Sequence, residues 1–440
     1  MITRFHFSRF KSYKNTQVLP LGSLTVLIGA NAAGKSNAIE AMRFLSWLAQ
    51  GGKLSSLNYD MGKTDSGIRG HVSKITYLGG TEFEVGCIVS EDKKEYDLNT
   101  TVQLRNEDLH VFGETLKDLN RERFIYEVDG PSTGYSSDIR VQYDNYTKGP
   151  NKPFITCSDQ MAVFTQLDSP ATFPDNYGQT KKEIPELSKK LQETLSSILF
   201  LDPVPTRMRG DALASEKRLK GDGANLSGVL NFLWNQGEEM KKSILRFIQS
   251  LPEQDIAKLD FIEIPQRNQV MVQLVETFGN VQNIFDASRL SDGTLRVLAI
   301  AAAMLSAPNG SLVVIEEIDN GVHPSRAHHL LEAIREISEQ RKLRVLLSTH
   351  NPALLDALPD KAIPDVVFCY RDPIEGDSRL VRLSDMPDAP ELFVQGPLGQ
   401  LMTNGALERF VKYRPTPAQK QKLSIDWLES LEPVFKVAEE

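Results

Sequence analysis

The chain has 440 residues, of which 40% are hydrophobic and 25% charged, a balance typical of a globular protein with one large or two medium domains. Its formal net charge of −8 argues against a dedicated DNA-binding module, since such modules are usually basic, but it does not exclude a local basic groove. There is no run of about 18 apolar residues and no apolar signal core at the N-terminus, and the three cysteines are scattered. We therefore expect no membrane span, no disulfide framework, no zinc site and a cytoplasmic location.

The N-terminal segment is predicted to run strand, strand, loop, helix. Residues 1–28 alternate in polarity and end in the apolar run 24–28, which indicates a buried strand. A glycine-containing loop follows, and a helix is expected over 35–48.

Residues 51–168 differ from the segment before them. Short β-rich runs alternate with Gly, Asp, Asn and Pro clusters, which predicts a mostly β section inserted after the first helix. The expected strands are 81–89, 97–104, 124–128 and 139–143. Helical patterns follow over 181–199 and 226–251, and these helices form either a short protruding arm or lid, or part of an ordinary core.

The second half alternates between strands and helices. Residues 259–264 and 270–276 are predicted to form a hairpin. The expected elements after it are helix 291–306, strand 311–315, helix 325–339, strand 344–348, helix 352–358 and strand 366–370. This alternation predicts an α/β fold with a mixed or parallel sheet wrapped by helices. A Pro-rich and then helical tail is expected to reach Glu440.

Residues 29–36 (GANAAGKS) fit the pattern G-x-x-x-x-G-K-[ST] and lie between the predicted strand and helix. Gly29 and Gly34 would let backbone N–H groups curl around phosphate oxygens at a helix N-terminus. Lys35 would meet the β- and γ-phosphates, and the Ser36 hydroxyl would be a Mg²⁺ ligand. Asn31 and Asn37 complete the candidate nucleotide-binding set. The alternative is a glycine turn followed by Lys-Ser by chance.

Two acids follow the apolar run 312–315. Ligands bind at the C-terminal ends of strands in open α/β sheets, so Glu316 would hold Mg²⁺ directly or through water, and Glu317 would orient and deprotonate the attacking water. Taken alone this pattern is weak, because many strands end in charged residues.

Two further segments carry candidate phosphate contacts. Residues 290–294 (LSDGT) open a helix, where Ser291 and Gly293 would bind an anion or would simply cap the helix. His350 follows the strand 344–348 and would either hydrogen-bond a γ-phosphate or make a structural bond.

The order of these motifs resembles the ABC-type ATPases of the SMC, RecF and double-strand-break-repair group. The likeness is strongest to stand-alone AAA-family ATPases of bacterial defence and DNA-repair loci, such as the OLD and PtuA types. The segments that carry it are 10–13 (FKSY), 34–37 (GKSN), 219–226 (LKGDGANL) and 319–324 (DNGVHP). The resemblance implies ATP and Mg²⁺ as cofactors, held between two heads of a homodimer or larger homo-oligomer.

In that family the phosphate loop of one head faces the signature of the other. Ser291 and Gly293 would thus contact the γ-phosphate in trans, Asp319 would lie near the dimer seam, and His350 would be the sensor histidine. Two departures are visible: Glu316 stands where aspartate is more common, and Asp292 stands where glycine is common. Gln103 is a weak candidate for the glutamine loop, and Phe10 or Tyr13 for an adenine stack.

The resemblance implies a head of residues 1–50 and 259–385, a β-rich insertion of 51–180, a helical arm of 181–258 and a helical tail of 386–440. It implies an ATP-hydrolysing switch whose head dimerisation controls a separate, nuclease-like effector, in bacterial anti-phage defence. No Toprim nuclease pattern follows His350. Three histidines, His323, His328 and His329, are expected to be structural, because no convergent spacing supports a metal site.

The alternative is a DNA repair or recombination ATPase that binds DNA through a basic stripe. Its residues would come from the runs 181–182, 189–190, 217–220 and 241–242. A transporter's nucleotide-binding subunit fits less well because the β insertion is large, and a GTPase fits less well because the Asn-Lys-x-Asp motif is absent.

Overall fold

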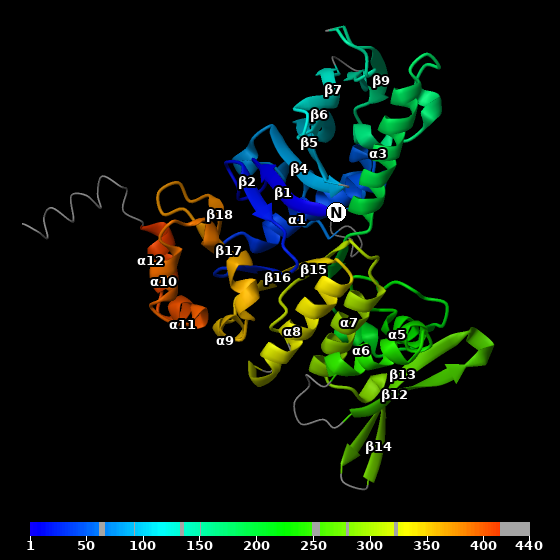
Figure 1. The fold of residues 1–440 in the computed structure, drawn as a ribbon, viewed down its shortest axis with the longest axis vertical. Helices are drawn as coiled ribbons and strands as arrows, with labels where there is room; N and C mark the ends of the chain where they lie inside the picture. The colour runs from blue at the N-terminus through cyan, green and yellow to red at the C-terminus, as the bar shows by residue number, and fades with distance from the viewer. Residues whose placement is uncertain are drawn as a thin grey trace, which may run out of the picture.

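A computed structural model describes residues 1–60, 67–91, 93–132, 136–149, 151–248, 256–278, 281–320 and 324–413. These residues form three sheets with helices around them, a mixed α/β architecture as predicted (Figure 1). Among the described residues, no helix combines the length and the apolar character needed to cross a membrane.

The central sheet has six strands, parallel except for β18 at one edge. In spatial order they are β10 (Leu199–Leu201), β15 (Leu312–Ile315), β16 (Arg344–Thr349), β3 (Thr25–Ile28), β17 (Val366–Arg371) and β18 (Ser378–Arg382). All residues of β3 and β15 are buried, as expected for strands covered on both faces. The N-terminal strand β3 thus lies between β16 and β17, which come from the far end of the chain.

The second sheet is antiparallel and has eight strands. They are, in order, β2 (Gln17–Pro20), β1 (Ile2–Ser8), β4 (Glu82–Glu91), β5 (Lys94–Arg105), β6 (Asp108–Asp118), β7 (Arg123–Gly130), β8 (Asp138–Tyr143) and β9 (Phe154–Ser158). The β-rich segment is therefore continuous with the first two strands of the chain rather than a separate sheet.

The third sheet contains the predicted hairpin, formed by β12 (Ile256–Ile264) and β13 (Gln269–Phe278). Its turn ends at Asn268, which has a left-handed backbone, a conformation that asparagine tolerates well. On its other edge β13 pairs with β11 (Ala212–Leu213) and β14 (Val281–Asp286).

The helices are distributed over the two faces of the central sheet. On one face are α1 (Lys35–Ala49) and α3 (Gly178–Ser196), whose apolar residues join the core of the eight-stranded sheet. The other face carries α5 (Leu226–Trp234), α6 (Glu238–Ile248), α7 (Asp292–Ser306), α8 (Pro324–Gln340), α9 (Pro352–Asp356), α11 (Leu398–Thr403) and α12 (Ala406–Lys412). Three short helices complete the set: α2 (Leu57–Asp60), α4 (Pro205–Met208) and α10 (Ala389–Phe393).

The two segments that we grouped as a helical arm lie in different hydrophobic cores. Ile184 and Leu191 of α3 are buried with the eight-stranded sheet, whereas Val229 of α5 and Phe247 of α6 are buried on the opposite face of the central sheet. Each of these helices buries an apolar face in one of the two cores. They are therefore ordinary core helices, the second of the two alternatives given above, and not a protruding arm or lid. The tail is helical in α10 to α12, and residues 414–440 lie outside the described residues.

Candidate functional site

The phosphate loop joins β3 to α1, as the motif predicts. Gly29 and Gly34 have φ angles of 150° and 122°, which favour glycine. A Cβ on Gly34 would lie 2.5 Å from Ser378 Oγ, and one on Gly29 would lie 2.2 Å from the Cys369 carbonyl oxygen. Both glycines are therefore required by backbone conformation and by close packing.

Lys35 folds back along this loop. Its ammonium donates to the carbonyl oxygens of Gly29, at 2.7 Å, and Ala30, at 3.0 Å. Partial burial lowers the pKa of Lys35, while the nearby carboxylates of Glu317 and Asp319 act in the opposite direction. The cation thus lies within the electrostatic reach of the acids that follow β15.

A network of hydrogen bonds joins the phosphate loop and the start of α1 to the N-terminal segment and to β18. Tyr13 Oη donates to the Gly34 carbonyl at 3.1 Å. Ser12 Oγ accepts from Asn37 Nδ2 and from Ser378 Oγ, each at 2.8 Å. Asn37, a predicted nucleotide ligand, therefore uses its amide to tie α1 to the N-terminal segment.

The expectation that Phe10 or Tyr13 stacks on adenine is wrong. Both side chains are fully buried, Phe10 against Phe83 and Tyr13 against Phe7, so no face of either ring is open to a ligand. Gln103 lies within β5, where it accepts a hydrogen bond from Arg105 Nε at 2.6 Å.

The two acids after β15 have different surroundings. Glu316 Oε1 accepts from Arg43 Nη2 at 2.6 Å, and this guanidinium stacks over the Phe200 ring at 4.5 Å. Glu317 has a positive φ of 48°, a conformation uncommon outside glycine. Its N–H donates to Ser348 Oγ at 3.0 Å, which fixes its backbone at the end of the strand.

The Glu317 carboxylate is exposed and accepts from Asn320 Nδ2 at 2.7 Å. His350 follows β16, the strand between β15 and β3, and its Nδ1 lies 3.5 Å from Asp319 Oδ2. Asp319 also accepts from Thr349 Oγ1 at 2.7 Å. The strands β15, β16 and β3 are adjacent and parallel. The phosphate loop, Glu317 and His350 follow their C-terminal ends and therefore lie along the same edge of the sheet.

Ser291 and Gly293 lie elsewhere, at the start of α7. Ser291 caps the helix, because its Oγ accepts from the Thr294 N–H at 3.1 Å. Within the described part of the chain, no hydrogen bond or ion pair joins Ser291 or Gly293 to residues 29–36. Asp292 is paired with Arg209 at 2.6 Å, so its charge has a partner within the same head.

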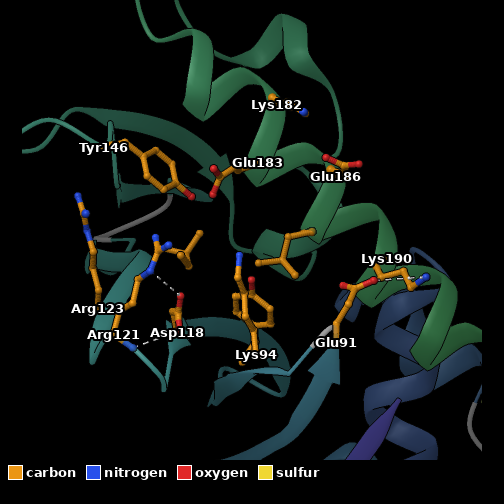
Figure 2. Close-up of a pocket in the computed structure, with 13 residues that line it drawn as sticks. Glu91, Lys94, Asp118, Arg121, Arg123, Tyr146, Lys182, Glu183, Glu186 and Lys190 are labelled. Carbon is orange, nitrogen blue, oxygen red and sulfur yellow. Dashed lines mark hydrogen bonds and ion pairs between the residues drawn. The ribbon is translucent and has the colours of Figure 1, made fainter.

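The predicted basic runs are distributed over three elements. Two of them lie on α3, one in the loop before α5 and one on α6. Lys182 and Lys190 line a cavity of about 450 Å³ between α3 and the eight-stranded sheet, but Glu91, Asp118, Glu183 and Glu186 line it too (Figure 2). Lys190 lies 3.5 Å from Glu91, and Lys241 lies 2.8 Å from Glu238.

His328 and His329 belong to α8, and His328 Nδ1 lies 3.1 Å from the Ala357 carbonyl oxygen. Among the described residues, no group of three or more His, Cys, Asp or Glu side chains could hold a metal ion. His323 lies outside the described residues.

Sequence patterns did not predict the supporting roles of Ser12, Arg43, Arg209 and Ser348. Each lies in an ordinary helix, strand end or loop and acts through a contact with a residue remote in the sequence, so no local spacing reveals it. A cavity of about 300 Å³ was equally unforeseen. It is lined by Ala30, Asn31 and Ala33, by residues 368–371 and by residues of α11 and α12.

A phosphate loop joined to a mixed α/β sheet defines the class of P-loop nucleotide-binding proteins. Residues 24–127 and 121–356 match the family described as "AAA domain, putative AbiEii toxin, Type IV TA system". The chain belongs to this AAA family, and the prediction that it is an ATPase is confirmed at this level.

The individual proteins that the chain resembles share little sequence identity with it. The chain is 21% identical over 379 residues to a Helicobacter pylori protein described as an ATP/GTP phosphatase, covering 84% of this chain and 90% of that protein. An SMC head bound to the C-winged helix domain of ScpA is 16% identical, with a TM-score of 0.47 over 86% of this chain and 97% of that one. The SMC head domain from Thermotoga maritima is 12% identical, with a TM-score of 0.38 over 87% and 98% of the two chains.

Proposed function

We propose that this ATPase is a switch in which two heads close around two nucleotides and open again after hydrolysis. The proposal rests on one observation, namely that the candidate site residues form two separate groups within one head. Lys35, Glu317 and His350 lie at one edge of the central sheet, whereas Ser291 and Gly293 lie at the start of α7. Within the described residues, neither forms a hydrogen bond or ion pair with the phosphate loop of its own head. A second head would complete the site.

In this proposal the loop residues Gly29, Asn31, Gly34, Lys35 and Ser36 bind the phosphates through backbone N–H groups and the lysine cation. Glu317 takes the proton from the attacking water, and its exposed carboxylate and fixed backbone suit that role. His350, held beside Asp319, donates to the γ-phosphate oxygen. Ser291 and Gly293 of the second head contact the same phosphate.

The oxygen atoms of Ser36 and Glu316 fit Mg²⁺, a hard cation that prefers such ligands. When bound, Mg²⁺ would neutralise charge on the β- and γ-phosphates. Glu316 is engaged by Arg43, so it would hold the ion through water or after the guanidinium moves.

We assign the opening and closing to control of a separate effector protein, in bacterial defence of the OLD or PtuA kind. The description of the family, which names a putative toxin, is compatible with this role. Direct DNA binding is the weaker alternative, because the candidate lysines are spread over three elements and several are paired with carboxylates.

The test compares wild type, Glu317→Gln and Lys35→Ala, with and without DNA, by ATP turnover and by mass from light scattering. Glu317→Gln should bind ATP, lose at least about 100-fold in turnover and accumulate as a dimer or larger species. Lys35→Ala should neither hydrolyse ATP nor associate. Stimulation of the wild type by DNA would favour the DNA alternative, and unchanged turnover in Glu317→Gln would refute the assigned base.

A further inference from the structure

Arg209 binds the loop that leads into residues 290–294, the candidate signature motif. Its Nη1 donates to the carbonyl oxygens of Ser288, at 2.9 Å, and Leu290, at 2.7 Å. Its Nη2 donates to Asp292 Oδ1 at 2.6 Å. One guanidinium therefore holds two carbonyl groups and one carboxylate within five consecutive residues, a use of the planar fork that a lysine could not reproduce.

The backbone that carries Arg209 is held in place by close packing and by a hydrogen bond. It directly follows α4, where Met208 is buried, and a Cβ on Gly223 would lie 2.5 Å from the Met208 sulfur. The Val204 N–H donates to the Asp222 carbonyl oxygen at 3.0 Å, which ties the start of α4 to the same loop. The Arg209 side chain is about one-third exposed.

The ion pair between Arg209 and Asp292 also changes the charge of the signature motif. Its carboxylate is 67% exposed and stands between Ser291 and Gly293, the two residues that we assign to a phosphate of the second head. An isolated carboxylate would repel that phosphate, whereas an ion pair presents no net charge to it.

We propose that Arg209 is a positioning residue of the signature, an inference that rests on the two-head function above. It neutralises Asp292 and holds residues 288–292 so that Ser291 and Gly293 face the nucleotide of the second head. Because Arg209 acts through residues 288–292, it affects closure of the two heads and leaves binding of ATP to a single head unchanged.

The experiment uses the full chain with Glu317→Gln as parent, so that ATP-bound dimers accumulate. Into it we introduce Arg209→Gln, the pair Arg209→Gln/Asp292→Asn, and Arg207→Gln as the matched control. Arg207 precedes Arg209 by two residues and also forms an ion pair, with Asp222 at 2.7 Å, but in the described structure it makes no hydrogen bond or ion pair with residues 288–292. Light scattering gives the association constant with ATP, and a fluorescent ATP analogue at low protein concentration gives the affinity of the single head.

We expect Arg209→Gln to weaken association by about tenfold or more with unchanged affinity of the single head, and Arg207→Gln to match the parent. Removing both charges in the pair variant should restore most of the lost association. If the parent associates and Arg209→Gln associates equally well, the role of Arg209 is refuted. A pair variant as weak as Arg209→Gln would refute neutralisation and leave only a structural support. A parent that stays monomeric with ATP would refute the two-head function, and the role of Arg209 with it.

Discussion

Tyr13 illustrates how a single residue can support a site without belonging to its motif. Its hydroxyl holds the Gly34 carbonyl, and its buried ring leaves no surface for adenine. The sequence pattern correctly placed the loop from Gly29 to Ser36 between a strand and a helix, because glycine spacing and the Lys-Ser pair are local. It could not predict the contact between Ser12 and Ser378, since these residues are 366 positions apart in the chain.

Gly34→Ala tests the packing of this loop. The new methyl group would require an uncommon backbone angle and would meet Ser378 Oγ, so we expect affinity for a fluorescent ATP analogue to fall by about tenfold or more. Gly310→Ala is the matched control, because Gly310 also has a positive φ, of 80°, but faces open space. It should lower thermal stability and leave nucleotide affinity unchanged. Equal affinity in the two variants would contradict this account.

Glu114 gives a prediction about pH. Its buried carboxyl accepts hydrogen bonds from Tyr126, Thr100 and the N–H groups of Val163 and Phe164, but burial still raises its pKa to about 7. The folded state therefore holds this proton more tightly than the unfolded chain, and stability from Glu114 is lost as pH rises from about 4.5 to 7.

Chemical denaturation of wild type and Glu114→Gln at pH 5, 6, 7 and 8 measures this effect. The variant should be less stable throughout, because an amide NH₂ would face N–H donors. The wild-type advantage should shrink by about 2 kcal/mol between pH 5 and 7, and by less than about 1 kcal/mol more between pH 7 and 8. A pH-independent difference would show that Glu114 does not titrate in this range.

At the scale of elements, four strands of the central sheet, β3, β15, β16 and β17, were predicted to within a residue or two, because each carries a short apolar run. The other two, β10 and β18, were not predicted. Residues 226–251, predicted as one helix, are divided into α5 and α6, since Gly237 has a φ of 122° and interrupts the helical backbone. Strands β6 and β9 were missed because polar residues and Gly113 obscure their alternation.

Gly228 in α5 tests how closely this helix packs on the third sheet. A Cβ there would lie 2.2 Å from the Leu213 carbonyl oxygen, so Gly228→Ala should destabilise the fold by about 1–3 kcal/mol. Gly178, at the start of α3, has open space around it, and Gly178→Ala should be neutral or stabilising by up to about 1 kcal/mol. Thermal unfolding of both variants measures the contrast, and loss of stability in both or in neither would refute the packing argument.

At the scale of the whole molecule, the central sheet separates two cores. Leu312 and Val314 of β15 face the core shared with the eight-stranded sheet, whereas Val313 and Ile315 face the core shared with α7. Alternation within an apolar strand is invisible in the sequence, so the assignment of helices to faces, and hence the separation of 181–199 from 226–251, could not be predicted.

The placement of β3 between β16 and β17 also constrains how the chain is made. Residues 25–28 leave the ribosome early, but both neighbouring strands come from residues 344–371. Until most of the chain has been synthesised, this apolar segment has no partners within its own sheet and is exposed to aggregation or to chaperones. Nascent chains that stop short of β16 should therefore lack a formed phosphate loop, so nucleotide cannot stabilise this protein during most of its synthesis.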